Sequence, residues 1–116
     1  MKISKAYLDA YDKIQDTVEK AIKESGQNVL IRYSAYEDVN DIPINSLNEI
    51  PVKGKVIFHD EEEQFKSKVY DSPTWLEVAV IANEMVSITN NYRTFLETLE
   101  VYSDGDISKA IIVMDI

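Results

Sequence analysis

The chain has 116 residues, of which 45% are hydrophobic, and it contains no cysteine. This length suits a single compact domain over residues 1–116, and the lack of thiols excludes cysteine nucleophiles, disulfides and thiolate zinc sites. The 21 acidic and 12 basic residues give a net charge of −9. That charge disfavours direct binding to nucleic acid or to an anionic membrane. We find no secretory signal and no membrane-spanning apolar run, so we expect a cytoplasmic protein.

The negative charge is concentrated in the second half of the chain. Residues 1–58 hold eight Lys/Arg and nine Asp/Glu, a net charge of −1, whereas residues 59–116 hold four and twelve, a net charge of −8. A field of one sign steers association with a surface of the opposite sign. A protein with a basic surface is therefore the partner that the distribution favours.

The first predicted element is an amphipathic helix. Ser4 can cap its start and Gly26 can end it in a left-handed turn. The apolar residues recur at spacings of three and four, which places them on one face: Tyr7, Tyr11, Ile14, Val18, Ala21 and Ile22.

A strand and a long polar connection are predicted next. Residues 28–36 alternate between apolar and polar side chains, as in a strand with one buried face. Residues 37–52 are polar, contain Pro43 and Pro51, and can form a short helical turn near residues 46–49.

Residues 54–70 are predicted to form a hairpin. With residues 60–63 as the loop, Phe58 pairs with Phe65 and Val56 pairs with Ser67, which gives one apolar face. The lone histidine of the chain, His59, then lies at the wet end of the hairpin.

The C-terminal part is predicted to hold a helix and a second hairpin. Ser72 is the expected N-cap, Pro73 opens the helix, and Asn90 can supply the left-handed exit. Asp104 and Gly105 between two β-rich runs predict a two-residue type I′ turn. The implied register pairs Glu100 with Lys109, Leu99 with Ala110, and Phe95 with Met114.

These elements predict an α+β fold in the order α-β-β-β-α-β-β. The simplest arrangement is a five-stranded, mostly antiparallel sheet with both helices packed on one face.

The sequence gives little support for catalysis or metal binding. His59 and the four acids that follow it, Asp60 to Glu63, are expected to be a solvated hairpin tip, because exposed, mutually repelling carboxylates lack a fixed geometry. Residues 104–115 resemble a calcium loop, but Lys109 stands where an EF-hand needs glycine. Glycine-rich phosphate loops and a serine-hydrolase elbow are absent. We therefore predict no enzyme, no catalytic residue, no cofactor and no metal.

Two features favour binding functions. Glu97 is predicted on an apolar strand face opposite Ile112, so it is a candidate pocket carboxylate, with an edge position as the simpler interpretation. Tyrosines beside abundant acids are typical of protein-binding surfaces. The candidate partner-binding residues are Asp60, Glu61, Glu62, Glu63, Tyr33, Tyr36, Tyr92, Tyr102, Asp104 and Asp106.

The leading functional prediction is a small acidic, non-enzymatic protein that binds a protein with a basic surface. It would act as an inhibitor, an immunity factor or an adaptor, as phage- and plasmid-encoded inhibitors of basic nucleic-acid-handling proteins do. The alternative is a small-molecule-binding module with a pocket between the sheet and helix 73–89. A homodimer through an exposed strand is compatible with both.

Overall fold

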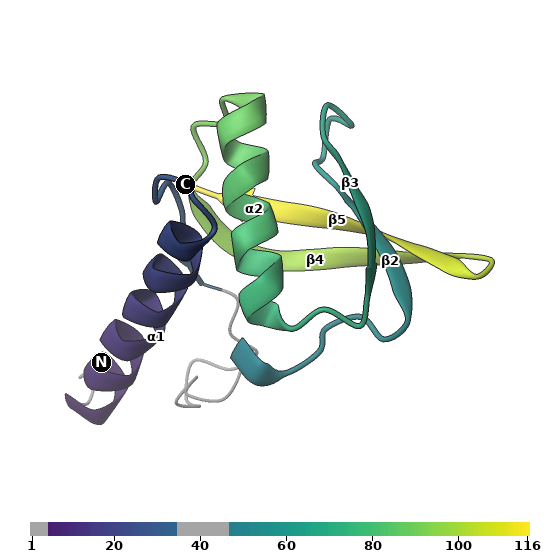
Figure 1. The fold of residues 1–116 in the computed structure, drawn as a ribbon. Coiled ribbons are helices and arrows are strands. Elements are labelled where there is room, and N and C mark those ends of the chain that lie inside the picture. The colour runs from purple at the N-terminus through teal and green to yellow at the C-terminus, as the bar shows by residue number, and fades with distance from the viewer. Residues whose placement is uncertain (1–4, 35–46) are drawn as a thin grey trace.

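A computed structural model describes residues 5–34 and 47–116, apart from the side chains of residues 6, 7 and 104 (Figure 1). The predicted order of elements is confirmed. The elements are α1 (Lys5–Glu24), β1 (Arg32–Tyr33), β2 (Lys55–His59), β3 (Lys66–Asp71), α2 (Trp75–Thr89), β4 (Phe95–Asp104) and β5 (Ile107–Asp115).

The sheet is mixed and curled, so the prediction of a mostly antiparallel sheet is wrong. The strand order is β1-β4-β5-β2-β3. The hairpins β2–β3 and β4–β5 are antiparallel, but β5 pairs with β2 in parallel and β1 pairs with β4 in parallel. Turn residues specify the two hairpins locally, whereas the pairing between hairpins is set by how their apolar faces meet in space.

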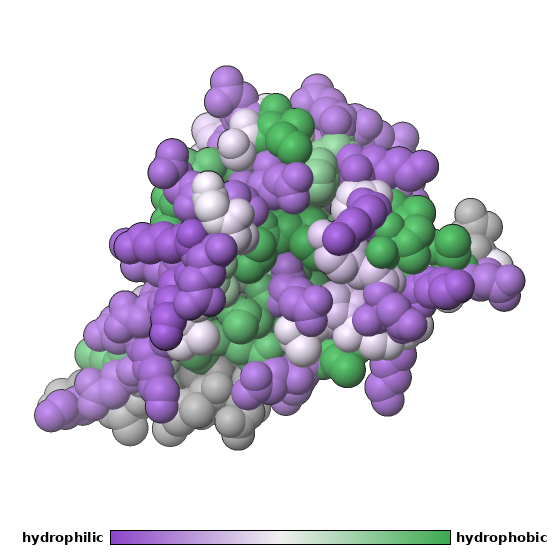
Figure 2. All heavy atoms as spheres, in the orientation of Figure 1, coloured by the Kyte–Doolittle hydropathy of each residue, from purple (hydrophilic) through white to green (hydrophobic). Residues whose placement is uncertain are grey.

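The buried side chains form one cluster between the sheet and the helices. Val56 and Phe58 of β2 are fully buried and lie beside Ala110 and Ile112 of β5. Helix α2 lies across this face of the sheet, and α1 lies beside α2 next to β1 (Figure 1). Polar side chains cover the outer side of α1, and hydrophobic ones appear between the helices (Figure 2).

The predicted cap of α1 is confirmed at its C-terminal end. Gly26 has a φ of 84°, and the N–H of Gln27 donates to the carbonyl of Ile22. Ile14, Val18 and Ile22 are buried as the spacing predicts. Ser4, the predicted N-cap, lies outside the described residues. The side chain of Tyr7, which was assigned to the apolar face, lies outside them as well.

Strand β1 is much shorter than the predicted strand 28–36. Ile31 and Tyr33 are buried while Leu30 and Arg32 are exposed, so the predicted alternation is correct. The N–H groups of Leu30 and Ile31, however, donate to the side chain of Asn83 on α2 instead of to a strand. A helix side chain thus replaces the strand partner of residues 30 and 31, and of the described residues 28–34 only Arg32 and Tyr33 belong to a strand.

The start of α2 also differs from the prediction. Thr74 is the N-cap and forms a capping box with Glu77, so the assignment of Ser72 as the cap is wrong. Ser72 has a φ of 48°, and its hydroxyl accepts a hydrogen bond from the N–H of Gly54. The predicted exit is confirmed, because Asn90 is the left-handed C-cap with a φ of 57°.

Both hairpin registers are shifted from the predicted ones. Val56 pairs with Tyr70 and His59 pairs with Lys66, because a bulge and a wider loop, residues 60–65, separate β2 from β3. In the second hairpin, Leu99 pairs with Ile112. Its turn residues are Gly105 and Asp106, and Gly105 has a φ of 67° at the first of these positions, as in a type II′ turn.

Candidate functional site

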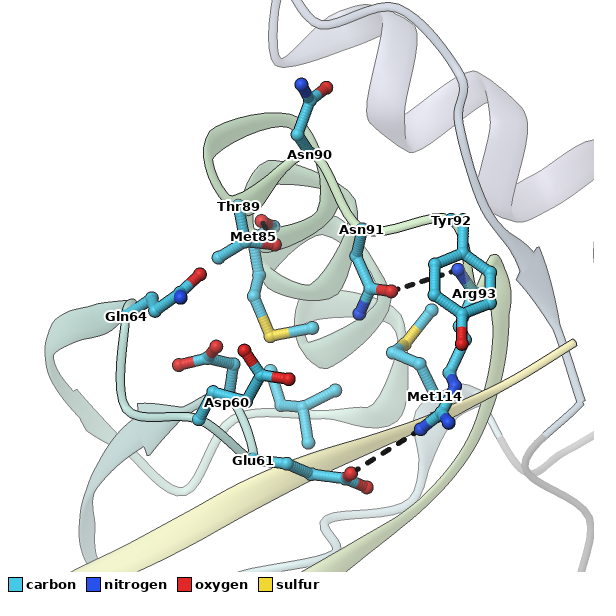
Figure 3. Close-up of a pocket in the computed structure, with 12 residues that line it drawn as sticks. Asp60, Glu61, Gln64, Met85, Thr89, Asn90, Asn91, Tyr92, Arg93 and Met114 are labelled. Carbon is cyan, nitrogen blue, oxygen red and sulfur yellow. Dashed lines mark hydrogen bonds and ion pairs between the residues drawn. The ribbon is translucent and has the colours of Figure 1, made fainter.

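A cavity of about 260 Å³ opens where the β2–β3 loop meets the C-terminal end of α2. The loop supplies acids and an amide, the helix exit supplies polar groups, and β5 supplies an apolar wall (Figure 3). The lining residues are Asp60, Glu61, Glu62, Gln64, Met85, Thr89, Asn90, Asn91, Tyr92, Arg93, Ile112 and Met114.

Asp60 is held in place at this cavity, so the expectation of a fully solvated hairpin tip is wrong for this residue. The residue is only 6% exposed, and Oδ1 accepts a hydrogen bond of 2.8 Å from the N–H of Phe65. Phe65 is itself buried, because the wide loop turns its ring into the core instead of pairing it with Phe58. The remaining acids of the loop are exposed, as predicted.

Two acids of the loop form ion pairs within the chain. Glu61 Oε2 lies 3.8 Å from a guanidinium nitrogen of Arg93, and Glu63 accepts a hydrogen bond from the ammonium group of Lys109. Both pairs are largely exposed to solvent, where such pairs contribute about 0–1 kcal/mol. Lys109 also lowers the pKa of the Glu63 carboxyl. The four acids are therefore not equivalent: two have basic neighbours, and Asp60 has a backbone donor.

The end of α2 adds to the negative potential at the cavity. The C-terminus of a helix carries a partial negative charge from its terminal carbonyls. The last turn of α2 contains no basic residue that would offset it. Thr89, Asn90 and Asn91 follow one another around this end of the helix and border the cavity (Figure 3). The helix end and the loop carboxylates thus both favour a cation.

The cavity wall is apolar where it reaches the core. Met85 of α2 and Ile112 and Met114 of β5 are buried, and all three line the cavity. Figure 3 shows the Met85 thioether facing the same space as Asp60, with Glu61 directed at Arg93. A ligand that fits here would combine a positive charge with an alkyl segment.

His59 lies beside this site but does not line it. Burial lowers its pKa, and the nearby ammonium groups of Lys109 and Lys66 lower it further, against the opposing effect of Glu63 and Asp60. A neutral imidazole is therefore favoured. Across the sheet His59 pairs with Lys66 and with Ile111.

The predicted partner-binding residues separate into three places. Tyr33 is fully buried against Trp75, with ring centroids 6.2 Å apart, so it belongs to the core and not to a partner surface. Tyr92 is 73% exposed and borders the acidic cavity. Tyr102 and Asp106 are exposed on the projecting β4–β5 hairpin. Tyr36 lies outside the described residues, as does the side chain of Asp104.

Glu97 does not occupy a buried pocket. It lies at the irregularity between Leu96 and Thr98, where β4 changes register against β5, and its side chain is exposed. Its predicted partner Ile112 pairs with Leu99 instead. The bulge releases Glu97 from the apolar row, which agrees with the simpler interpretation of an edge position.

Sequence reasoning missed the residues that complete the cavity, above all Arg93 and Met85. Arg93 is one of only four basic residues among residues 59–116. The scarcity of bases in an acidic segment was the signal that could have linked it to residues 60–63. Met85 carried no such signal, because a methionine in an apolar helix is typical of the core.

Within residues 5–34 and 47–116, no group of three or more histidine or acidic side chains is arranged to hold a metal ion. Among these residues, no helix combines the length and the apolar character needed to cross a bilayer. No protein-family model, no curated protein and no solved structure matches the chain.

Proposed function

We propose that this chain is a non-enzymatic protein that binds a basic protein partner, and that a lysine or arginine side chain of the partner enters the cavity beside Asp60. The supporting observation is the fixed, buried carboxylate of Asp60 at an opening that the end of α2 also makes negative. The alkyl part of such a side chain would pack on Met85 and Met114, as long basic side chains do on apolar surfaces.

The size and charge of the cavity support a side chain over a larger ligand. Small-molecule pockets commonly span about 300–1,000 Å³, and this cavity lies just below that range. Arg93 already lies beside Glu61 and over the ring of Tyr92, with the guanidinium carbon 5.6 Å from the ring centroid. The chain's own guanidinium therefore occupies one side of the site in the way that a partner's cation would.

A titration with blocked arginine amide, followed by NMR, tests this proposal. We expect shifts at Asp60, Gln64 and Tyr92, and several-fold weaker binding by Asp60→Asn, which keeps the acceptor for the Phe65 N–H but removes the charge. Asp106→Asn is the matched control, because it makes the same change of charge on an exposed turn away from the cavity.

Arg93→Gln gives an independent readout in the same titration. Removing the internal cation frees Glu61 for the ligand, so we expect tighter binding of blocked arginine amide. The contrary outcome is that Asp60→Asn and Asp106→Asn lower the affinity for blocked arginine amide equally while Arg93→Gln leaves it unchanged. That outcome would show that the ligand responds only to the overall charge of the protein. Such a result would overturn the assignment of the cavity.

A small organic cation is the second candidate ligand, because the cavity lies between α2 and the sheet and joins an apolar wall to carboxylates. A hydrophobic amine such as hexylamine would then bind with weak dependence on salt, whereas capture of a basic protein weakens steeply as salt rises. Comparing hexylamine with a basic peptide at low and high salt separates the two functions.

A further inference from the structure

Of the strands in the described part of the chain, only β1 pairs with the outer edge of β4, and it covers only the start of that strand. β4 pairs with β5 from Phe95 to Asp104, but β1 pairs with β4 only at Phe95 and Leu96. Among the described residues, no strand lies against residues 98–104 on this side. Figure 1 shows the β4–β5 hairpin projecting beyond the helices. This open stretch directly continues the edge to which β1 is already bonded.

The register identifies which backbone groups face outward. Asp104 and Ile107 flank a two-residue turn, so they form a hydrogen-bonded pair, and bonded and non-bonded pairs alternate from there along an antiparallel ladder. Leu99, Val101 and Ser103 fall in non-bonded pairs. Their N–H and C=O groups therefore point away from β5 and can bond to an added strand.

The outer edge of β4 lacks the lysine residues that discourage strand pairing at the opposite edge of the sheet, which is formed by β3. Strand β3 carries Lys66 and Lys68, and charged lysines discourage further pairing. Strand β4 contains neither lysine nor proline between Phe95 and Asp104. Its outer part also exposes Val101 and Tyr102, which are 47% and 53% accessible. Hydrophobic side chains are visible on this hairpin in Figure 2.

The charge of the edge indicates what would bind there. Glu97 and Glu100 are exposed, and neither forms an ion pair with another described residue. Lys109, opposite Tyr102, directs its ammonium group to Glu63. A second copy would place further glutamates against these two, and each copy has a net charge of −9. A basic strand would instead form cross-strand pairs of opposite charge.

We propose that the outer edge of β4, residues 98–103, accepts an extended basic segment of a partner protein as an additional strand of the sheet. Main-chain bonds to Leu99, Val101 and Ser103 supply affinity, and lysine or arginine side chains opposite Glu100 select the segment. The class of partner rests on the proposed function, but the surface is separate from the cavity.

A short blocked peptide that alternates lysine with valine tests the edge directly. On binding, we expect slower hydrogen exchange at the amides of Leu99, Val101 and Ser103, measured by NMR. A peptide that alternates glutamate with valine should give no such protection. Val101→Pro removes an outward N–H without breaking the β4–β5 ladder, so it should abolish protection, whereas Val101→Thr keeps the N–H and should preserve it.

A second variant, Glu100→Lys, tests the same edge if Val101→Pro fails to fold, because it reverses one exposed charge and leaves the backbone unchanged. Glu100→Lys should weaken the lysine peptide by about twofold to fivefold and improve binding of the glutamate peptide, as expected for one cross-strand pair. Two results would overturn the inference. One is lysine-peptide binding that protects no amide at residues 98–103, and the other is protection of this edge by self-association without any peptide.

These outcomes separate the two proposals. Failure at the edge with retained binding of blocked arginine amide at Asp60 leaves the cavity assignment intact. Edge protection without any response at Asp60 supports strand addition and refutes the role of the cavity.

Discussion

Asn83 is the residue whose replacement tests the structure most sharply. It lies on α2 with no exposed surface, yet its side chain is polar. Oδ1 accepts hydrogen bonds from the N–H groups of Leu30 and Ile31 at 2.7 and 3.2 Å. Nδ2 donates to the side-chain oxygen of Gln27 at 2.9 Å and to the carbonyl of Asn28 at 2.8 Å. One amide thus fixes the segment that leads into β1.

Asn83→Ala removes all four hydrogen bonds. Ile31 is buried, so its N–H would lose the Asn83 acceptor and stay unsatisfied away from water, at a cost of about 1–3 kcal/mol. The other three bonds involve partly accessible groups, and each contributes about 1 kcal/mol. The expected loss in the free energy of unfolding is therefore about 4–6 kcal/mol. The free energy of unfolding of a small domain is typically about 5–15 kcal/mol, so this loss would be a large fraction of the total.

Asn83→Asp separates hydrogen bonding from volume. It keeps the acceptor for the N–H groups of Leu30 and Ile31 but turns a second oxygen towards the carbonyl of Asn28. Burial and this contact raise the pKa of the introduced carboxyl above its unfolded value of about 3.9. The neutral acid can still donate, so the variant is least destabilised below the unfolded pKa and loses stability as the pH rises through the folded pKa.

Urea unfolding followed by the fluorescence of Trp75, the only tryptophan, measures both effects at neutral and at acidic pH. Glu84→Ala is the matched control, because Glu84 is the next residue of α2 and is exposed; its effect should stay within about 0.5 kcal/mol. An Asn83→Ala loss no larger than that of the control would refute the reasoning.

Two further predictions concern titration. Because burial and nearby ammonium groups lower the folded pKa of His59, stability should fall as the pH drops from the ordinary value of 6.5 towards the folded one, and urea unfolding of His59→Gln should lack this component. Burial, and then the charges of Glu84 and Glu77, raise the pKa of Tyr70. Glu84→Gln should therefore lower the pKa of the Tyr70 phenol, as measured by NMR of the ring carbons, and an unchanged pKa would contradict the electrostatic effect of Glu84.

The parts of the fold that depend on local chemistry could be predicted from the sequence. The buried face of α1 follows from the spacing of Ile14, Val18 and Ile22, and the ends of the helices follow from Gly26 and Asn90. Each of these signals acts within one or two turns of the chain, so no knowledge of the tertiary structure is needed.

The errors arose where a distant group replaced a local one. The β2–β3 register depends on Asp60 accepting the N–H of Phe65, which widens the loop. The length of β1 depends on Asn83, since this side chain takes the backbone N–H groups that a strand partner would otherwise take. A single sequence does not reveal which buried amide meets which backbone segment, so neither effect could be derived from it.

The candidate site was predictable only in part, for the same reason. The run of acids at residues 60–63 is evident in the sequence, but its surroundings come from α2, from the segment before β4 and from β5. Tyr33 shows the limit of composition as evidence: a tyrosine near acids was assigned to a surface, yet it packs edge-on against Trp75 in the core.

The distribution of ion pairs changes what the net charge of −9 means for a partner. Glu61 and Glu63 have cations of their own chain beside them, so part of the acidic loop is already neutralised. Those pairs are exposed and weak, and a partner's lysine or arginine can replace Arg93 at a cost of about 1 kcal/mol or less. Under the proposed function, the long-range field would attract many basic proteins alike. Selection among them would then have to come from groups with fixed directions, such as the hydrogen-bonded carboxylate of Asp60 and the outward backbone groups of β4.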